Sequence, residues 1–210
     1  MLKILAVSDQ EAPIIESPAL AELYGDVDVV LSCGDLPYTY LEYIATMLPA
    51  RCLYVHGNHD HPQLLANGRM LKEPGGWHNV DCTTMHVKGW IIGGLEGSIR
   101  YRPGVPYQYT EQEMQNRIHR MTLSMLMNRL FKGRYIDILI THAPPFHIHD
   151  GEDHSHRGFQ ALLRFIERFQ PGYLLHGHQH RTNIQRWHTT CGETEVINIF
   201  PYRRLELEKA

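Results

Sequence analysis

Residues 51–60 read Arg-Cys-Leu-Tyr-Val-His-Gly-Asn-His-Asp. The mostly apolar run at residues 51–56 is typical of a short buried strand, and residues 57–60 predict a turn directly after it. A turn needs only Gly-Asn, so the histidine and aspartate that follow it suggest a site rather than a simple change of direction.

Two stretches upstream have the same form. Leu2–Val7 is an apolar run that leads to Asp9-Gln10-Glu11, and Val27–Ser32 leads to Gly34-Asp35. Short helices are predicted between the three runs, over Pro18–Tyr24 and Tyr38–Leu48. Strand, helix, strand, helix, strand in units of about twenty-five residues predicts right-handed crossovers and a parallel sheet.

The same form returns in the second half of the chain. Ile136–Thr141 leads to His142, and Tyr173–His176 leads to Gly177-His178-Gln179-His180, with a helix predicted over Phe159–Phe169 between them. If the five predicted strands lie side by side, the polar residues that follow them converge at one edge.

The middle of the chain predicts other elements. Val80–Val87 and Trp90–Gly94 are short β runs around a Lys88-Gly89 turn, and a loop rich in Pro, Gly and Tyr extends from Ser98 to Tyr109. Thr110, with Glu113 three residues later, predicts the capped start of a long helix that Gly133 ends. We expect its apolar stripe to pack into the core and its exposed side to offer a contact in a homo-oligomer. The stripe consists of Met114, Ile118, Met121, Met125 and Leu130. Asn183–Trp187 and Glu195–Ile199 predict a closing antiparallel pair.

Length and composition predict a single domain over residues 1–210. The net charge of −3 gives no basic field that would favour nucleic acid or an anionic membrane as a partner. We find neither a signal-peptide pattern nor a transmembrane stretch, and the four cysteines form no Cys-x-x-Cys pair. These features favour a cytoplasmic protein with reduced thiols. The fifteen histidines exceed what packing requires and favour metal chemistry.

The residues after the five predicted strands are types that bind divalent cations. Side chains two apart in a strand point to the same side, so we expect Asp9 and Glu11 to face one site. Gly34 allows a sharp bend, after which the carboxylate of Asp35 can bridge two cations. The remaining candidate ligands are an amide oxygen and three imidazoles, from Asn58, His142, His178 and His180. Two divalent cations bring a charge of about +4 against about −3 from the three carboxylates, which favours a deprotonated water at neutral pH. Mixed oxygen and imidazole ligands favour Mn, Fe, Ni or Zn over Ca.

Taken together, the five stretches resemble the motifs of the calcineurin-like metallophosphoesterases, over residues 4 to about 200. The resemblance implies an α/β fold, a four-layer α/β/β/α sandwich with two central mixed sheets, and a two-metal site at the strand ends. By motif position it implies that Asp9, residue 11 and His180 bind the first cation, that Asp35 bridges, and that Asn58, His142 and His178 bind the second. It also implies that His59 contacts the phosphate and assists the leaving group. Asp60 beside it would orient the site or cap the turn.

Two features depart from the family pattern. The first motif of the family usually reads Asp-x-His, whereas this chain has Glu11 in the third place. We favour ligation by Glu11, which keeps an oxygen donor there; the alternative is that Glu11 stays away and the first cation binds weakly. Leu36-Pro37 lacks the acidic and arginine residues of the protein Ser/Thr phosphatase branch, which disfavours a phosphoprotein substrate.

We therefore expect a dinuclear-metal-dependent phosphoesterase, and favour a phosphodiesterase that hydrolyses a small phosphodiester by attack of a metal-bridging hydroxide. His59 would protonate the leaving oxygen. In the segment Pro144–Gly158, Arg157 is expected to contact phosphate together with Asn58 and His59, the alternatives being a solvated loop or a further metal site. The rival hypotheses are a nuclease of the same family, which the absence of a basic stripe disfavours, and a catalytically weak fold that serves as a protein-binding scaffold.

Overall fold

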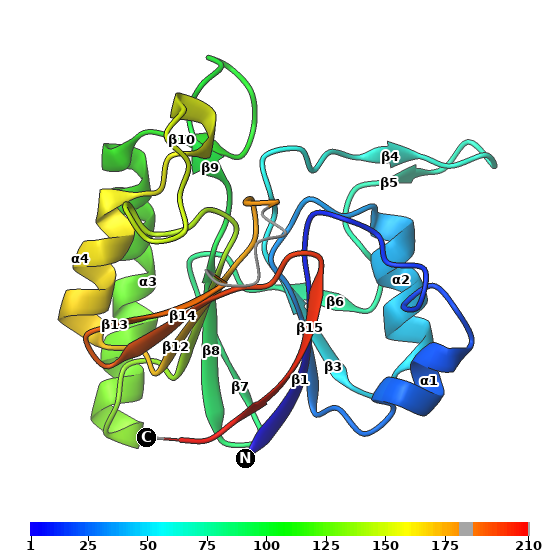
Figure 1. Cartoon of the computed structure of the whole chain (residues 1–210), viewed down its shortest axis with the longest axis horizontal. Coiled ribbons are helices and arrows are strands. Elements are labelled where there is room, and N and C mark those ends of the chain that lie inside the picture. Colours follow the sequence, from blue (N-terminus) through cyan, green and yellow to red (C-terminus); the bar gives the residue numbers. More distant parts are fainter. Residues whose placement is uncertain (181–186, 210) are drawn as a thin grey trace.

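Two mixed β-sheets pack face to face at the centre of the computed structural model, which describes residues 1–180 and 187–209 (Figure 1). The first sheet has the strand order β15-β1-β2-β3-β6. β1 to β3 and β6 run parallel, and β15 pairs antiparallel with β1 at the edge. The bounds are β1 Leu2–Val7, β2 Val29–Ser32, β3 Arg51–Tyr54, β6 Trp77–Asn79 and β15 Tyr202–Leu207.

The second sheet has the order β13-β14-β12-β11-β8-β7, with parallel strands at its centre and antiparallel ones at both edges. Its strands are β7 Thr84–Val87, β8 Trp90–Leu95, β11 Ile138–Thr141, β12 Tyr173–His176, β13 His188–Cys191 and β14 Thr194–Asn198. Two short pairs lie outside the sheets, β4 Gln63–Leu64 with β5 Met70–Leu71 and β9 Ser98–Ile99 with β10 Gln108–Tyr109.

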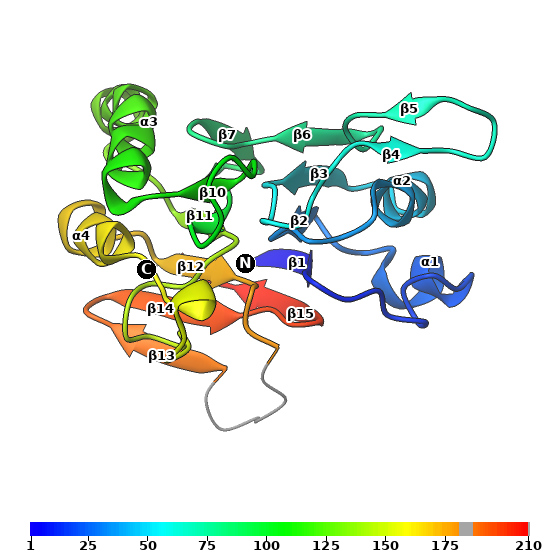
Figure 2. The ribbon, with the colours of Figure 1, turned by 90° about the horizontal axis from the view of Figure 1, so that it is seen from above.

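Helices cover the outer face of each sheet, which confirms the four-layer sandwich. Seen from above in Figure 2, α1 and α2 lie on one side of the molecule, and α3 and α4 lie on the other. The helices are α1 Ala19–Tyr24, α2 Tyr38–Met47, α3 Glu111–Lys132 and α4 Gln160–Phe169, with a single 3₁₀ turn, η1, at His154–His156. None of the described helices combines the length and the apolar character needed to cross a membrane.

β1 shows why the sheets are central. Leu2, Ile4 and Ala6 pack between the two sheets, whereas Leu5 and Val7 pack against α1 and α2. All five side chains are fully buried. A strand covered on both faces needs an almost continuous apolar sequence, which is what made it recognisable.

α3 begins and ends where the sequence predicts, with a capping box between Thr110 and Glu113 and Gly133 in the left-handed region. Its apolar stripe is predicted correctly except for Leu130, which is 73% exposed. Leu130 comes five residues after the buried Met125 and is therefore turned about 140° away from the core face. The homo-oligomer contact on the exposed side of α3 stays a prediction.

A predicted hairpin turn is confirmed, whereas the bounds of two strands differ from those expected. The Lys88-Gly89 hairpin turn is confirmed, since Val87 pairs with Trp90 and both turn residues have positive φ. β7 begins only at Thr84, because Asp81 instead forms an isolated bridge to Gly94. The closing antiparallel pair is β13 with β14. Its first strand is described from His188, Trp187 before it is not in a strand, and residues 183–186 of the expected strand lie outside the described residues.

Candidate metal centre

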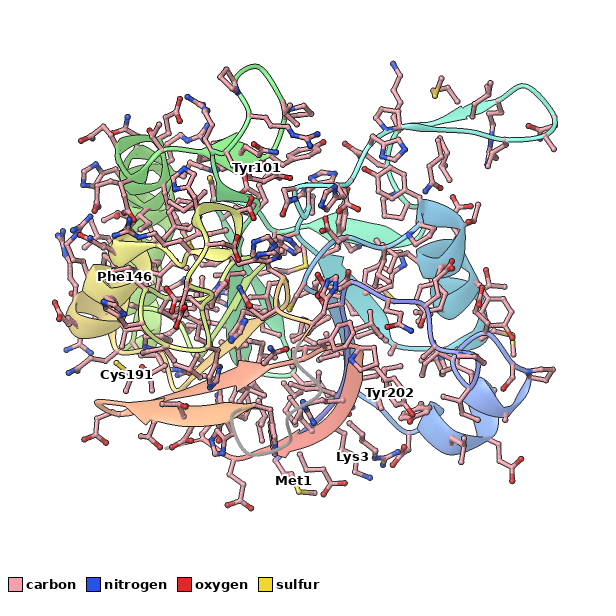
Figure 3. All side chains as sticks on the ribbon, turned by 45° about the horizontal axis from the view of Figure 1, so that its top comes forward. Met1, Lys3, Tyr101, Phe146, Cys191 and Tyr202 are labelled. Atoms are coloured by element: carbon pink, nitrogen blue, oxygen red, sulfur yellow. The ribbon has the colours of Figure 1, made fainter. Side chains whose placement is uncertain are left out.

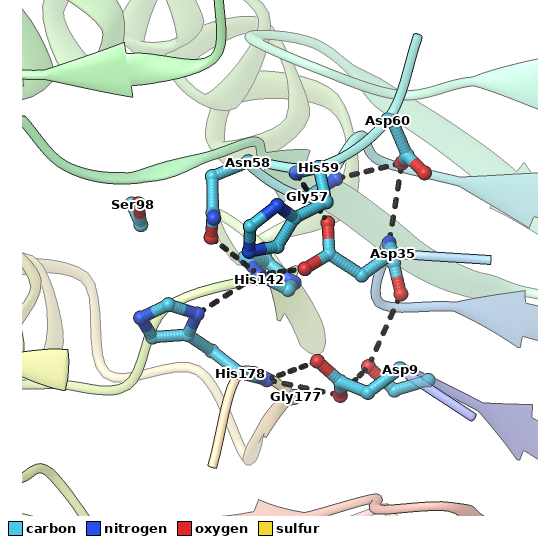
Figure 4. Close-up of polar contacts among 12 residues, drawn as sticks. Asp9, Asp35, Gly57, Asn58, His59, Asp60, Ser98, His142, Gly177 and His178 are labelled. Carbon is cyan, nitrogen blue, oxygen red and sulfur yellow. Dashed lines mark hydrogen bonds and ion pairs between the residues drawn. The ribbon is translucent and has the colours of Figure 1, made fainter. Parts of the chain in front are cut away.

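The loops that follow β1, β2, β3, β11 and β12 lie side by side at one edge of the two sheets. The backbone N–H of Asp9 donates to the carbonyl of Gly34 at 3.1 Å, and that of Gly177 donates to the carbonyl of His142 at 3.1 Å. Contacts between the β1 and β12 loops join the two sheets at this edge, since the backbone N–H of His178 donates to the Asp9 carboxylate. The five stretches that are scattered along the sequence form one site in space (Figure 4).

The centre of the site is a cluster of three ligand types around one imidazole nitrogen. His142 Nε2 lies 3.0 Å from Asn58 Oδ1, 3.1 Å from His178 Nδ1 and 3.3 Å from Asp35 Oδ2. The ligand atoms of Asp35, His142 and His178 all lie within 4.8 Å of one another. His142 is fully buried and Asn58 is 4% exposed, so the cluster lies largely out of water. Four donor atoms facing one point form a cation site in outline.

The opposite ring nitrogen of each histidine in the cluster is held by a backbone carbonyl. His142 Nδ1 donates to the carbonyl of Cys33 at 2.8 Å, and His178 Nε2 donates to that of Ser155 at 2.8 Å. These bonds fix which nitrogen of each ring faces the cluster, as second partners of metal-binding histidines do. His142 therefore presents Nε2 and His178 presents Nδ1.

The charges in the cluster are strongly coupled. Burial alone would lower the pKa of His142, but the adjacent carboxylate of Asp35 outweighs it and raises that pKa to about 9. Burial likewise raises the pKa of Asp35, and the His142 charge more than reverses this, to about 2. His178 is neutral, because burial and the positive charge of His142 lower its pKa to about 4. Without a cation, one proton on His142 Nε2 faces the other three acceptors, and a divalent cation can take its place.

Asp9 and His180 lie next to this cluster. The Asp9 carboxylate accepts the backbone N–H of His178, with both oxygens at 3.0 Å, and the hydroxyl of Ser8 at 2.5 Å. His180 Nε2 lies 3.3 Å from Asp9 Oδ1, which raises the pKa of His180, and its ring stacks on that of Phe200. Asp9 and His180 are two of the residues that the motif positions assign to the first cation.

Glu11 does not join Asp9 as expected. β1 ends at Val7, and Asp9 has a φ of 66°, so the chain is no longer extended and the expectation that alternate side chains share a face does not apply. Glu11 is exposed, and its side chain forms no hydrogen bond or ion pair in the described part of the chain. Ligation by Glu11 stays a prediction.

The backbone at the site is shaped to hold these carboxylates. Asp9, Asp35 and His178 have φ values of 66°, 57° and 65°, a left-handed region that non-glycine residues occupy uncommonly. A Cβ at Gly57 would lie 2.0 Å from Asp35 Oδ1, and one at Gly177 would lie 2.4 Å from Asp9 Oδ2. Each glycine therefore leaves the space that a carboxylate fills, and the donor set and the two cradles together fit a pair of divalent cations.

His59 and Asp60 complete the loop after β3. The backbone N–H of His59 donates to Asp35 Oδ1 at 2.8 Å, while the residue itself is exposed at the mouth of the site. The Asp60 carboxylate is buried and accepts the backbone N–H groups of Gly57, at 2.8 Å, and Asp35, at 3.2 Å. Burial and the neighbouring charge of Asp35 raise the pKa of Asp60 to about 6. Asp60 thus caps the turn and ties it to the loop after β2.

Arg157 lies at the rim rather than in the cluster. Its guanidinium stacks over the ring of Phe146, 4.6 Å from the centroid, and borders a cavity of about 640 Å³. The neighbouring histidines have partners of their own: His149 bonds to His176 at 2.9 Å, and His156 pairs with Asp153 at 2.8 Å. Within the described residues, the group of three side chains that could hold a cation is that of Asp35, His142 and His178, and none of its members comes from this loop.

Sequence reasoning missed three residues that hold the ligands in place. Ser8 bonds to Asp9, the carbonyl of Ser155 bonds to His178, and the Tyr101 hydroxyl bonds to Asn58. Ser8 adjoins a motif and could have been suspected from its position. Tyr101 lies in a loop and Ser155 in the single 3₁₀ turn η1, neither of which has a periodic pattern, so only the folded chain shows what they contact.

Comparison with known proteins agrees with this arrangement. The family model of the calcineurin-like phosphoesterases matches residues 2–182, and the chain therefore belongs to this family. A relative, the uncharacterized protein MJ1162 of Methanocaldococcus jannaschii, is 24% identical over 212 residues, covering 95% of this chain and 88% of that protein.

Two solved structures show the same fold. TT1561 of Thermus thermophilus has a TM-score of 0.58 at 19% identity, covering 94% of this chain and 88% of that one. GAP50, described as the anchor in the inner membrane complex of Plasmodium, has a TM-score of 0.56 at 10% identity, covering 94% and 70%. Family membership supports a metal-dependent phosphoesterase.

Proposed function

We propose that this protein is a dinuclear-metal-dependent phosphodiesterase that acts on a small phosphodiester. The observation that supports it most strongly is the convergence of Asp35, Asn58, His142 and His178 on one point, next to Asp9 and His180. Two bound cations of Mn, Fe, Ni or Zn would supply Lewis acidity toward the phosphoryl oxygens and lower the pKa of the attacking water.

The ligands divide between two positions. Asn58, His142 and His178 would hold one cation, and Asp9, His180 and Glu11 would hold the other. Asp35 would serve both cations. One of its carboxylate oxygens lies 3.3 Å from His142 Nε2, and the carbonyl of the preceding residue, Gly34, accepts the backbone N–H of Asp9. The two glycine cradles keep both carboxylates in place before a cation binds.

His59 would act on the leaving group. Its backbone is fixed by the bond to Asp35, and its exposed side chain can reach a substrate at the mouth of the site. A protonated imidazole there donates to the leaving oxygen as general acid. Asp60 supports this role indirectly, by holding the turn that carries His59.

The preference for a diester rests on charge at the rim. A hollow of about 540 Å³ beside His180 is bordered by Glu152 and Asp153, and the larger cavity beside Arg157 is bordered by Asp150 and Glu152. A phosphomonoester carries close to two negative charges at neutral pH and a diester carries one. Carboxylates at the rim therefore oppose a monoester more strongly, and Arg157 would be the cation that contacts the single charge of a diester.

The test is a screen of bis-p-nitrophenyl phosphate against p-nitrophenyl phosphate, with Mn, Ni, Zn, Mg and Fe supplied separately. We expect hydrolysis that depends on metal and prefers the diester. Asp35→Asn should abolish it, whereas Asp26→Asn, at an exposed aspartate paired with Lys3 and Arg204, should not. A strict monoester preference would contradict the diester assignment. Cleavage of duplex DNA with Mn would favour the nuclease, and protein that binds no metal would favour the scaffold.

A further inference from the structure

The side-chain amide of Asn58 must be held in one of two orientations for its oxygen to face the cluster. A carboxamide has two ends of almost the same shape, of which only the oxygen can bind a cation. Asn58 Oδ1 faces His142, and Asn58 Nδ2 points the other way, into the wall of the site. Because Asn58 is 4% exposed, that N–H₂ group needs a protein partner, and an unpaired buried donor costs about 1–3 kcal/mol.

The partner is Tyr101. Asn58 Nδ2 donates to the Tyr101 hydroxyl at 3.2 Å, across 43 positions of sequence. Tyr101 belongs to the loop between β9 and β10, and Figure 3 labels it where that loop overhangs the strand ends. The amide is therefore held at both ends, by His142 on the ligand side and by Tyr101 on the other.

The loop is built to fix Tyr101 although its tip is exposed. Gln108 is 2% exposed, and its side-chain oxygen accepts the backbone N–H groups of Tyr101, at 3.2 Å, and Arg102, at 3.0 Å. The guanidinium of Arg100 bonds to the Gln108 carbonyl and to Glu113 on α3. These contacts fix the backbone on both sides of Tyr101 without a strand or a helix there.

We propose that Tyr101 is a positioning residue that holds the Asn58 amide with its oxygen toward the cation, and so sets the affinity of the Asn58–His142–His178 position. This inference rests on the proposed function only in that the site binds cations. Partners that orient a ligand from behind are worth about 10- to 100-fold in metal affinity. Loss of the Tyr101 hydroxyl should therefore weaken one of the two binding steps by that factor and leave the other unchanged.

The experiment compares Tyr101→Phe with Tyr109→Phe. Tyr109 lies in β10 beside the same loop, and its hydroxyl donates to Glu96 at 2.6 Å rather than to a ligand. Mn²⁺ affinity is measured calorimetrically on metal-stripped protein, together with the melting temperature of that protein. We expect Tyr101→Phe to lower one affinity at least 10-fold, and Tyr109→Phe to leave both affinities unchanged although it too lowers the melting temperature of the metal-free protein.

A double-mutant cycle with Asn58→Ala provides the second test. If Tyr101 acts through Asn58, its substitution has no further effect on Mn²⁺ affinity once the amide is gone. Wild-type affinity in Tyr101→Phe, or an equal loss in both backgrounds, would overturn the proposal. A change confined to KM for a phosphodiester would instead make Tyr101 a substrate contact. Wild-type protein that binds two Mn²⁺ but hydrolyses no ester would contradict the proposed function and leave this test intact, whereas protein that binds none would contradict both.

Discussion

His142 carries the proton that a cation must displace. Its pKa of about 9 means that the metal-free site is protonated at neutral pH. His178, with a pKa of about 4, is a neutral imidazole whose Nδ1 carries no proton, and Asp35, with a pKa of about 2, is ionised. Because metal binding requires a neutral imidazole, the cation at this position should release about one proton. We expect calorimetric titrations at pH 7 in buffers of different ionisation enthalpy to show that release.

The same protein provides the control at higher pH. Release should decrease as the pH rises through about 9 and vanish at about pH 10, while metal affinity increases over the same range. In the metal-free protein, folding stability depends on pH in the opposite direction to metal affinity. The raised pKa of His142 stabilises the fold fully below its unfolded value of about 6.5, and this contribution is lost as the pH rises through about 9. Release that does not depend on pH would contradict the assignment of the proton to His142.

His59 is the residue whose loss should separate chemistry from metal binding. Its backbone N–H contacts Asp35, but its side chain is not in the cluster and is exposed. His59→Ala should therefore keep the metal content of the wild type and reduce kcat for a phosphodiester about 10²- to 10⁴-fold. Metal analysis and steady-state kinetics on the same preparation test this. An unchanged kcat would remove His59 from the role of acid.

The side chains that meet at the strand ends could be selected from sequence as candidate ligands, because each follows a recognisable strand and is of a type that binds cations. What could not be predicted is which other residues form hydrogen bonds to these side chains. Tyr101 and Ser155 contact Asn58 and His178 from 43 and 23 residues away, from a loop and a single 3₁₀ turn that have no periodic pattern. The extended backbone expected at Asp9 and Glu11 was wrong for a different reason: β1 ends at Val7 and Asp9 has a positive φ, which the sequence of an aspartate does not reveal.

At the scale of elements, α3 is joined to the β8 end of the second sheet by buried charges. Arg117 is 9% exposed and pairs with Asp81 and with Glu96, at 2.6 Å to the latter. Glu96 in turn bonds to His56, the residue before the loop that carries the ligand Asn58. Burial would raise the pKa of Glu96, but His56, Tyr109 and Arg117 together lower it.

Arg117→Met should therefore cost about 3–5 kcal/mol in unfolding free energy at pH 7, because it leaves buried carboxylates without their counter-charge. Wild-type Glu96 has a lowered pKa, so its contribution is present above about pH 4.5 and is lost as the pH falls below that value. The difference between variant and wild type should shrink over the same range, as measured by urea unfolding at pH 7 and pH 4. A matched Arg117→Met/Glu96→Gln double variant should recover part of the loss at pH 7. A single variant as stable as the wild type would show that the network contributes nothing.

Central strands were easier to predict than edge strands. β1 and β12 have the bounds that the sequence predicts, because a strand buried on both faces is apolar throughout. β15, Tyr-Arg-Arg-Leu-Glu-Leu, was missed: it is an edge strand with partly exposed residues, so its polar composition resembles that of a loop. Its pairing with β1 is non-local, spanning the chain from Leu2 to Leu207.

At the scale of the whole molecule, the stability of the fold is linked to the site at the strand ends. The ligand loops come from both sheets, since Asp35 follows the first sheet and His142 and His178 follow the second. A cation bound among them joins the two halves of the sandwich, and any ligand that binds only the folded state stabilises it. At a free metal concentration of about 100 times Kd, the gain is about 2.7 kcal/mol for one site, which corresponds to roughly 5–10 °C in Tm for a chain of this size.

We therefore expect Mn²⁺ or Zn²⁺ to raise the Tm of chelator-treated protein by that amount in differential scanning calorimetry, and EDTA to reverse the rise. Asp35→Asn should lose most of the response, because it removes the carboxylate that the two proposed positions would share, whereas Asp26→Asn should keep it. The response should also grow between about pH 6 and pH 9, since the cation competes with the proton on His142 for the same nitrogen. A Tm that does not respond to either cation across this pH range would show that the donor atoms at the strand ends do not bind metal, and would favour the scaffold over the enzyme.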